Sequence, residues 1–163
     1  MPLTAREGRA MNEDANWLVH DHRKYDASLA QCELAAGAGD WKEAVALFRE
    51  FVDDLELHMR MEDEVVYPLF RQQGDPDGAI DSLSEEHSTI ARLLQDLAYV
   101  IKRRDFDHFF DSLEPLHQAL VRHNRHEEEV LGRSPDTVLL RRDEIMERLE
   151  ALNRAAGRDS WAF

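Results

Sequence analysis

Two stretches of the chain, HMRMEDEVV at residues 58–66 and HNRHEEEVL at residues 123–131, share one pattern that decides the fold. In each stretch a histidine precedes a glutamate by four residues, so on a helix the two side chains project from one face. The stretches begin 65 residues apart, at 58 and 123, and leucines and an aspartate recur at that spacing in the segments before them. We therefore predict an internal repeat of two helical hairpins.

Two more histidines obey the same spacing, His22 in HDHRKY and His87 in EEHSTI. Each lies on the helix expected before one of the two stretches. Matching leucines are typical of any two amphipathic hairpins, but histidine and glutamate on an apolar stripe conflict with helical patterning unless something binds them. The candidate metal ligands are therefore four histidines and two glutamates: His22, His58, Glu62, His87, His123 and Glu127.

The choice of histidines leaves two alternatives open. His20 competes with His22, which the helical phase favours because it follows Leu18 by four residues and precedes Tyr25 by three. His126 is a candidate fifth histidine ligand, although a place at the rim of the site is favoured. The remaining acids of the runs at 62–64 and 127–129 are expected to form mostly solvated faces.

The apolar spacing is helical almost throughout, which predicts an all-α, up-down-up-down four-helix bundle with an additional C-terminal helix. We expect Pro68 to stop the second helix, Pro115 to kink or break the fourth, and Asp136 to cap the last. The expected divisions are a frayed N-terminus at 1–11, the bundle at 12–133, and the C-terminal helix and tail at 134–163.

Composition narrows the class of protein. The 163 residues include 20 Lys and Arg against 34 Asp and Glu, a net charge of -14 that argues against binding to nucleic acid or to an anionic membrane. A single cysteine, Cys32, excludes an internal disulfide and a cysteine-based zinc site. Because the sequence also lacks an apolar run long enough for a membrane span or a signal peptide, we expect a cytoplasmic protein.

Six candidate ligands in two equivalent sets are too many for one ion. Two divalent ions, each bound by two histidines and both bridged by the two glutamates, would use every group and keep the symmetry of the repeat. Nitrogen and oxygen donors without thiolate suit iron, manganese or zinc. Without metal, we expect the bundle to lose stability on acidification as the imidazoles gain protons.

In the motifs HDHRKY, HMRME, EEHSTI and HNRHE, the chain resembles the hemerythrin-like, HHE cation-binding family over roughly residues 12–133. The resemblance implies two iron ions in a non-haem centre with carboxylate bridges and an oxo or hydroxo bridge, with zinc or manganese less favoured. Oxygen-carrying members have a second histidine where this chain has Ala91, and an aspartate motif where it has Glu127.

The ligand set is closer to that of the iron-sulphur-cluster repair proteins and the iron and oxygen sensors of the family. The cysteine-containing N-terminal domain of the repair proteins is missing from this sequence. We therefore expect a protein that binds or senses O2, NO or peroxide at a di-iron site. The alternatives are a di-iron enzyme that turns over peroxide or NO or repairs clusters, and a metal-binding regulatory module. Neither enzymatic activity nor a homodimer is decided by the sequence.

Overall fold

Helix follows helix along the chain, and the computed structural model, which describes residues 17–75, 77–132 and 141–158, contains no strand in those ranges. The helical segments are α2 (Trp17–Gly37), α3 (Trp41–Met61), the π-helical η1 (Glu62–Val66), α4 (Tyr67–Gln73), α5 (Ala79–Arg103), α6 (Phe106–Gly132) and α7 (Arg142–Ala155).

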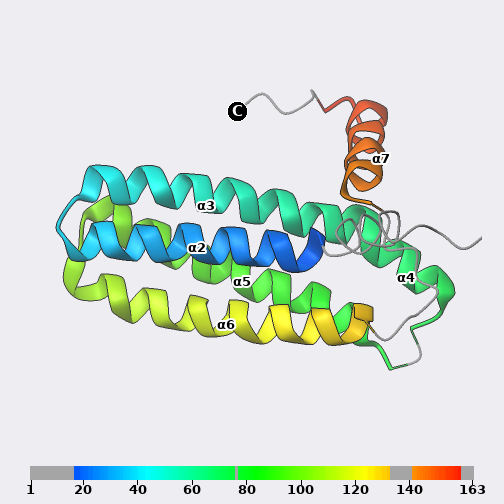
Figure 1. The fold of residues 1–163 in the computed structure, drawn as a ribbon, viewed down its shortest axis with the longest axis horizontal. Coiled ribbons are helices and arrows are strands. Elements are labelled where there is room, and N and C mark those ends of the chain that lie inside the picture. The colour runs from blue at the N-terminus through cyan, green and yellow to red at the C-terminus, as the bar shows by residue number, and fades with distance from the viewer. Residues whose placement is uncertain (1–16, 76, 133–140, 159–163) are drawn as a thin grey trace, which may run out of the picture.

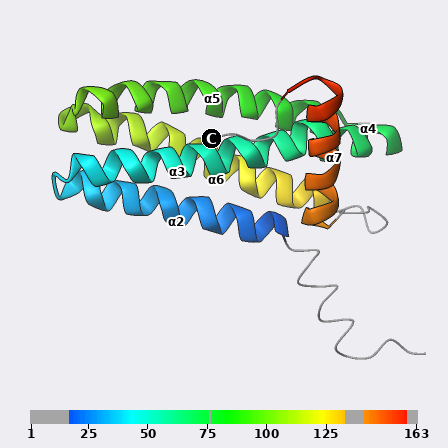
Figure 2. The ribbon, with the colours of Figure 1, turned by 90° about the horizontal axis from the view of Figure 1, so that it is seen from above.

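The four long helices form two antiparallel hairpins, α2 with α3 and α5 with α6, which lie side by side (Figures 1 and 2). The first turn is short because Gly39 adopts a left-handed conformation (φ 76°) and the Asp40 side chain accepts the amide of Glu43 at the start of α3. Arg104, with φ 52°, makes the corresponding turn between α5 and α6. The predicted all-α bundle with an extra C-terminal helix is confirmed.

The expectation that Pro68 ends the second helix is wrong. The helix continues past it, through η1 and α4, as far as Gln73. At this point the hydrogen bonds widen by one residue, so the amide of Tyr67 bonds to the carbonyl of Glu62, and Pro68 falls in the first turn of α4, where a proline is tolerated. The π-helical segment begins at Glu62, one of the candidate ligands.

Pro115 does not break the fourth helix, because α6 is continuous from Phe106 to Gly132. The proline is exposed, whereas Leu113 and Leu116 beside it are buried in the bundle. The carbonyl that loses its hydrogen-bond partner therefore lies toward water, and the buried leucines hold the helix in place.

Two apolar clusters fill the bundle and leave a polar layer between them. One, which contains Leu29, Phe51 and Leu97, lies toward the two hairpin turns. The other, which contains Leu83 and Val65, lies toward α4 and α7. The candidate ligands occupy the helical turns between the clusters, so water is excluded from both sides of the layer.

Helix α7 crosses the bundle instead of running along it (Figure 2). Its Ile145 and Leu149 are completely buried in the second apolar cluster. The predicted cap, Asp136, lies outside the described residues, and the described helix has Arg141 as its N-cap. Among the described helices, none is long and apolar enough to cross a membrane.

Candidate metal centre

The six predicted ligands meet in the polar layer of the bundle, although they come from five helical segments. Each is at most 5% exposed. The histidines come one from each long helix, and the glutamates from η1 and α6: His22, His58, His87, His123, Glu62 and Glu127.

Glu62 lies between two of the histidines. Its Oε1 is 2.6 Å from His58 Nε2, and its Oε2 is 3.1 Å from His87 Nε2. These contacts are short, but His58 Nε2 and both Glu62 oxygens are buried without a hydrogen bond of good geometry among the described residues. Such unpaired buried groups are costly unless a cation lies between them.

Glu127 lies between the other two histidines, but less symmetrically. Its Oε2 is 3.2 Å from His22 Nε2 and 3.8 Å from His123 Nε2. Its Oε1 accepts a hydrogen bond of 2.7 Å from the hydroxyl of Tyr67, which is fully buried. Only one oxygen of Glu127 therefore faces the histidines, whereas both oxygens of Glu62 do.

A second set of carboxylates surrounds the histidines and accepts hydrogen bonds from their outer nitrogens. The Nδ1 acceptors are Glu128 for His22 (2.8 Å), Asp21 for His58 (3.3 Å), Asp63 for His87 (2.9 Å) and Glu86 for His123 (2.8 Å). A carboxylate at Nδ1 keeps the proton there and leaves the Nε2 lone pair directed inward, which is the usual arrangement behind a metal-binding histidine.

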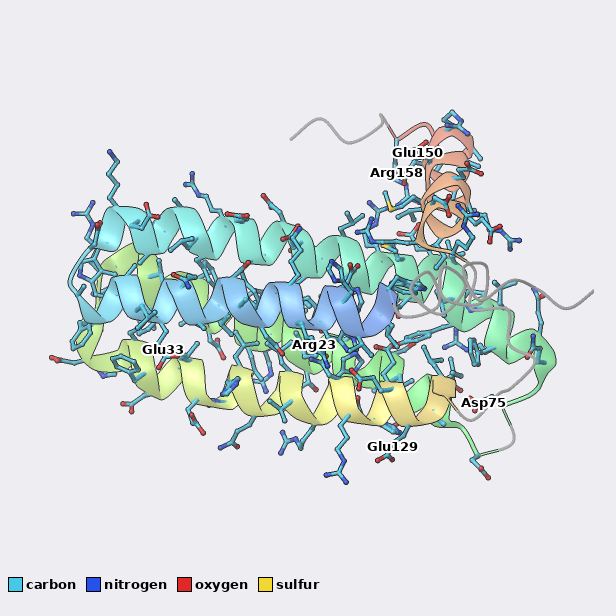
Figure 3. The ribbon with its side chains drawn as sticks, in the orientation of Figure 1. Arg23, Glu33, Asp75, Glu129, Glu150 and Arg158 are labelled. Carbon is cyan, nitrogen blue, oxygen red and sulfur yellow. The ribbon has the colours of Figure 1, made fainter. Side chains whose placement is uncertain are left out.

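The outer carboxylates were not predicted, although the sequence contains a signal for them. Asp21 and Glu86 are 65 residues apart, and so are Asp63 and Glu128, the same spacing that relates the inner residues. The expectation that the remaining acids of the two runs are mostly solvated holds for Asp63, Glu128 and Glu129, which are exposed, and Glu129 points away from the bundle (Figure 3). Asp63 and Glu128 nevertheless also accept the hydrogen bonds of His87 and His22.

The inner donor atoms fall into two groups that share one residue. Within each group the atoms lie within 4.8 Å of one another: His22, His58, Glu62 and Glu127 in the first, and Glu62, His87 and His123 in the second. The Nε2 atoms of His87 and His123 are 3.1 Å apart, although both are lone-pair sites when Nδ1 carries the proton. Lone pairs and carboxylates that converge in this way repel one another unless protons or cations lie between them, so each group could hold a cation.

A comparison with protein families finds a match to the hemerythrin HHE cation binding domain over residues 14–133. The chain belongs to this family. The match covers all six inner residues and ends before α7. Comparisons with curated proteins and with solved structures return no match. The HHE family binds cations, and the clustered histidines and glutamates of the polar layer could hold a metal ion.

The charges of the HHE site shift the pKa values of its own side chains. Burial alone would lower the pKa of His58, but the charge of Glu62 and the hydrogen bond to Asp21 raise it to about 10. The pKa of His87 rises to about 9 against the same effect of burial, because this imidazole bonds to Asp63 and faces Glu62.

The two inner carboxylates shift in opposite directions. Burial opposes ionisation of Glu62, but the neighbouring His58 and His87 outweigh it and hold the pKa of this carboxyl well below its usual range. Burial and the charge of Glu62 raise the pKa of Glu127. The site thus holds one strongly acidic carboxyl and one that resists losing its proton while the first is charged.

The other candidate residues lie outside the two donor groups. His20 is exposed, as the helical phase predicts. His126 is half-buried at the rim, where its Nδ1 bonds to Glu86 at 2.7 Å. Tyr67 was not predicted to reach the site, because it directly precedes the proline that was expected to end the helix.

Proposed function

We propose that this HHE protein holds a pair of iron ions between its four bundle helices and binds or senses a small ligand, O2, NO or peroxide, at that pair. The proposal is carried by one observation: two groups of nitrogen and oxygen donors share Glu62, and the four imidazoles direct Nε2 toward the space between them. Donors without thiolate favour iron, manganese or zinc over sulfur-preferring metals.

The composition of the second group supports iron in particular. It consists of two histidines and one carboxylate, His87, His123 and Glu62, a set that is typical of non-haem iron(II) and leaves coordination positions free. The first group would hold its ion with His22, His58, Glu127 and the shared Glu62. Iron bound there would supply open coordination positions and one-electron redox chemistry to a small ligand.

The protein contributes orientation and a dry environment. The outer carboxylates bond to Nδ1 of each imidazole, which orients the ring so that Nε2 is the nitrogen that would bind metal in exchange for its proton. The apolar clusters on both sides exclude water, so charge interactions within the layer are strong. The hydroxyl of Tyr67 satisfies the oxygen of Glu127 that faces away from the histidines.

Metal analysis of the purified full chain tests the first half of this proposal. Protein from iron-sufficient cells should contain about two iron ions per chain, and His58→Ala and His123→Ala should each disrupt the pair because each removes a donor from one group. His108→Ala is the matched control, since His108 is exposed and bonds only to Asp105 in the described structure. One zinc ion and no iron in the wild type would overturn the di-iron proposal.

Optical spectroscopy tests the second part of the proposal, that the iron pair binds a small ligand. The reduced protein, mixed anaerobically with NO or exposed to O2, should show absorption changes that His58→Ala and His123→Ala abolish and His108→Ala retains. The alternative, an enzyme, is separated by stoichiometry: consumption of many peroxide molecules per iron pair indicates turnover, and consumption of about one indicates binding or sensing.

We keep the cytoplasm as the proposed location and residues 12–133 as the proposed bundle domain.

A further inference from the structure

Helix α7 lies outside the matched family domain, yet one of its side chains contacts an outer carboxylate of the proposed metal centre. Arg142 is the first residue of α7, and its Nε donates to Asp21 Oδ2 at 3.1 Å. The same Asp21 oxygen accepts from His58 Nδ1 at 3.3 Å. We propose that α7 supports metal binding at this centre. Arg142 is a positioning residue, which sets the metal affinity of the first donor group through Asp21 and His58.

The contact joins elements that are otherwise distant in the sequence. Asp21 belongs to α2, His58 to α3 and Arg142 to α7, and the ion pair spans 121 positions. Asp21 is 8% exposed, so its carboxylate depends on these two partners instead of on water. The guanidinium is always charged and therefore holds Asp21 ionised and in one orientation, which in turn holds the His58 ring.

The remainder of α7 fixes Arg142 at this place. Ile145 and Leu149 are completely buried against the bundle. Near the other end of the helix, Asn153 accepts a hydrogen bond of 2.8 Å from Arg60, and Arg158, labelled in Figure 3, lies 3.4 Å from Glu64. The helix is thus bound to the bundle by contacts along its length, and its position determines that of the guanidinium.

Within the described residues, the second half of the repeat has no guanidinium that supports its outer carboxylate in this way. Glu86, the counterpart of Asp21, holds His123 Nδ1 with Oε2 and accepts from His126 Nδ1 with Oε1. Its second partner is therefore an imidazole on α6, within the bundle, and not a guanidinium on an added helix. The repeat relates the inner residues of the two halves in the sequence, whereas the contact with α7 adds a difference between the two donor groups.

This inference rests on the proposed two-metal centre, and cobalt(II) titration of the full chain after chelation tests it. His58→Ala and His123→Ala first assign the binding steps to the two donor groups. Asp21→Asn should then weaken the first group by about 10- to 100-fold, as is usual for the direct partner of a ligand. Arg142→Gln should weaken the same group by about threefold to tenfold, because its guanidinium is partly exposed and acts through Asp21.

Four comparisons separate positioning from a general loss of structure. Arg148→Gln, on the same helix and without an ion pair in the described structure, should bind cobalt like the wild type. Arg142→Lys, which keeps the charge, should recover part of the affinity. The double variant Arg142→Gln with Asp21→Asn should bind no more weakly than Asp21→Asn alone, whereas Arg142→Gln with Glu86→Gln should show both losses.

The outcomes are distinct. Equal weakening of both donor groups by Arg142→Gln, or losses that multiply in the double variant with Asp21→Asn, would overturn the positioning role. If the wild type shows two cobalt-binding steps and Arg142→Gln changes the affinity of neither, this inference alone is overturned. A wild-type chain that binds fewer than two cobalt ions would overturn the two-metal centre, and this inference with it.

Discussion

Tyr67 breaks the symmetry of the site with a single hydroxyl group. The corresponding position in the second half, 65 residues later, is Gly132, which has no side chain to offer. Because the hydroxyl occupies one oxygen of Glu127, the two glutamates differ in the number of oxygens that face the histidines. Sequence symmetry predicted two equivalent bridging glutamates, and the structure makes Glu62 better placed for that role.

Removal of this hydroxyl should destabilise the protein. Tyr67→Phe leaves a buried oxygen of Glu127 without its donor, and because the acceptor can carry a charge we expect a loss of about 1.5–3 kcal/mol in the free energy of unfolding. Tyr25→Phe is the matched control: its hydroxyl donates to the neutral side chain of Asn124 at 2.6 Å, so the loss should be about 0.5–1.5 kcal/mol. Urea denaturation of the two variants measures both; a larger loss for Tyr25→Phe would contradict this account.

Two of the histidines should make the stability of the chelated protein depend on pH. The pKa of His58 is about 10 and that of His87 about 9 in the fold, against about 6.5 in an unfolded chain. A raised pKa contributes stability that is fully present below pH of about 6.5 and is lost as the pH rises through the folded values of about 9 and 10. Urea midpoints of the chelated protein should therefore fall between neutral and alkaline pH.

For these two residues the raised pKa values predict the opposite of the sequence-based expectation for acid. His58 and His87 should already hold their protons at neutral pH in the chelated protein, so acidification should not destabilise it by charging them. Glu62 acts in the opposite sense, because its lowered pKa contributes stability that is lost only as the pH falls below its usual range. A double variant, His58→Gln with His87→Gln, should lose the alkaline decline, and His108→Gln should keep it.

At the scale of the element, α7 is held to the bundle by two fully buried side chains. Leu149→Ala should cost about 2–5 kcal/mol in the free energy of unfolding, because it leaves a cavity in the apolar cluster beside the site. Leu152 is 42% exposed on the same helix, and Leu152→Ala should cost well under this amount. Denaturant unfolding of both variants is the measurement, and equal losses would show that α7 is not packed as described.

The π-helical segment is the other element that shapes the site. It spans Glu62–Val66, and α4 continues the helix past Pro68. Tyr67, the first residue of α4, therefore lies on the side of the helix that faces Glu127. The sequence predicted an end to the helix at the proline, since a regular α-helix would clash there. A change of one residue in hydrogen-bond spacing removes that conflict, and a pattern of 3.6 residues per turn does not anticipate it.

At the scale of the whole molecule, metal and fold should stabilise each other. Metal binds the folded bundle, because the donors come from five helical segments that converge only there. At a free metal concentration about a thousandfold above the dissociation constant, the gain should be about 4 kcal/mol. Thermal unfolding of chelated and metal-loaded protein measures it, with His58→Ala as the variant that should lose the gain; equal melting temperatures would contradict metal coupling.

The sequence by itself determined the bundle and the set of inner residues. Helical periodicity reports which face of each helix is buried, and a repeat at a spacing of 65 reports which polar residues share that face, so His58 and His123 could be selected without coordinates. Both signals depend only on spacing along the chain.

Tertiary structure alone decided which groups touch. The pairing of Asp21 with both His58 and Arg142, and of Tyr67 with Glu127, joins residues on different elements. Such contacts depend on where each helix lies in space, and α7 could have packed its short apolar stripe against several faces of the bundle. The sequence repeat therefore predicted the symmetric set of inner residues. The differences between the two halves result from tertiary contacts made by α7 and by the helix that follows Glu62.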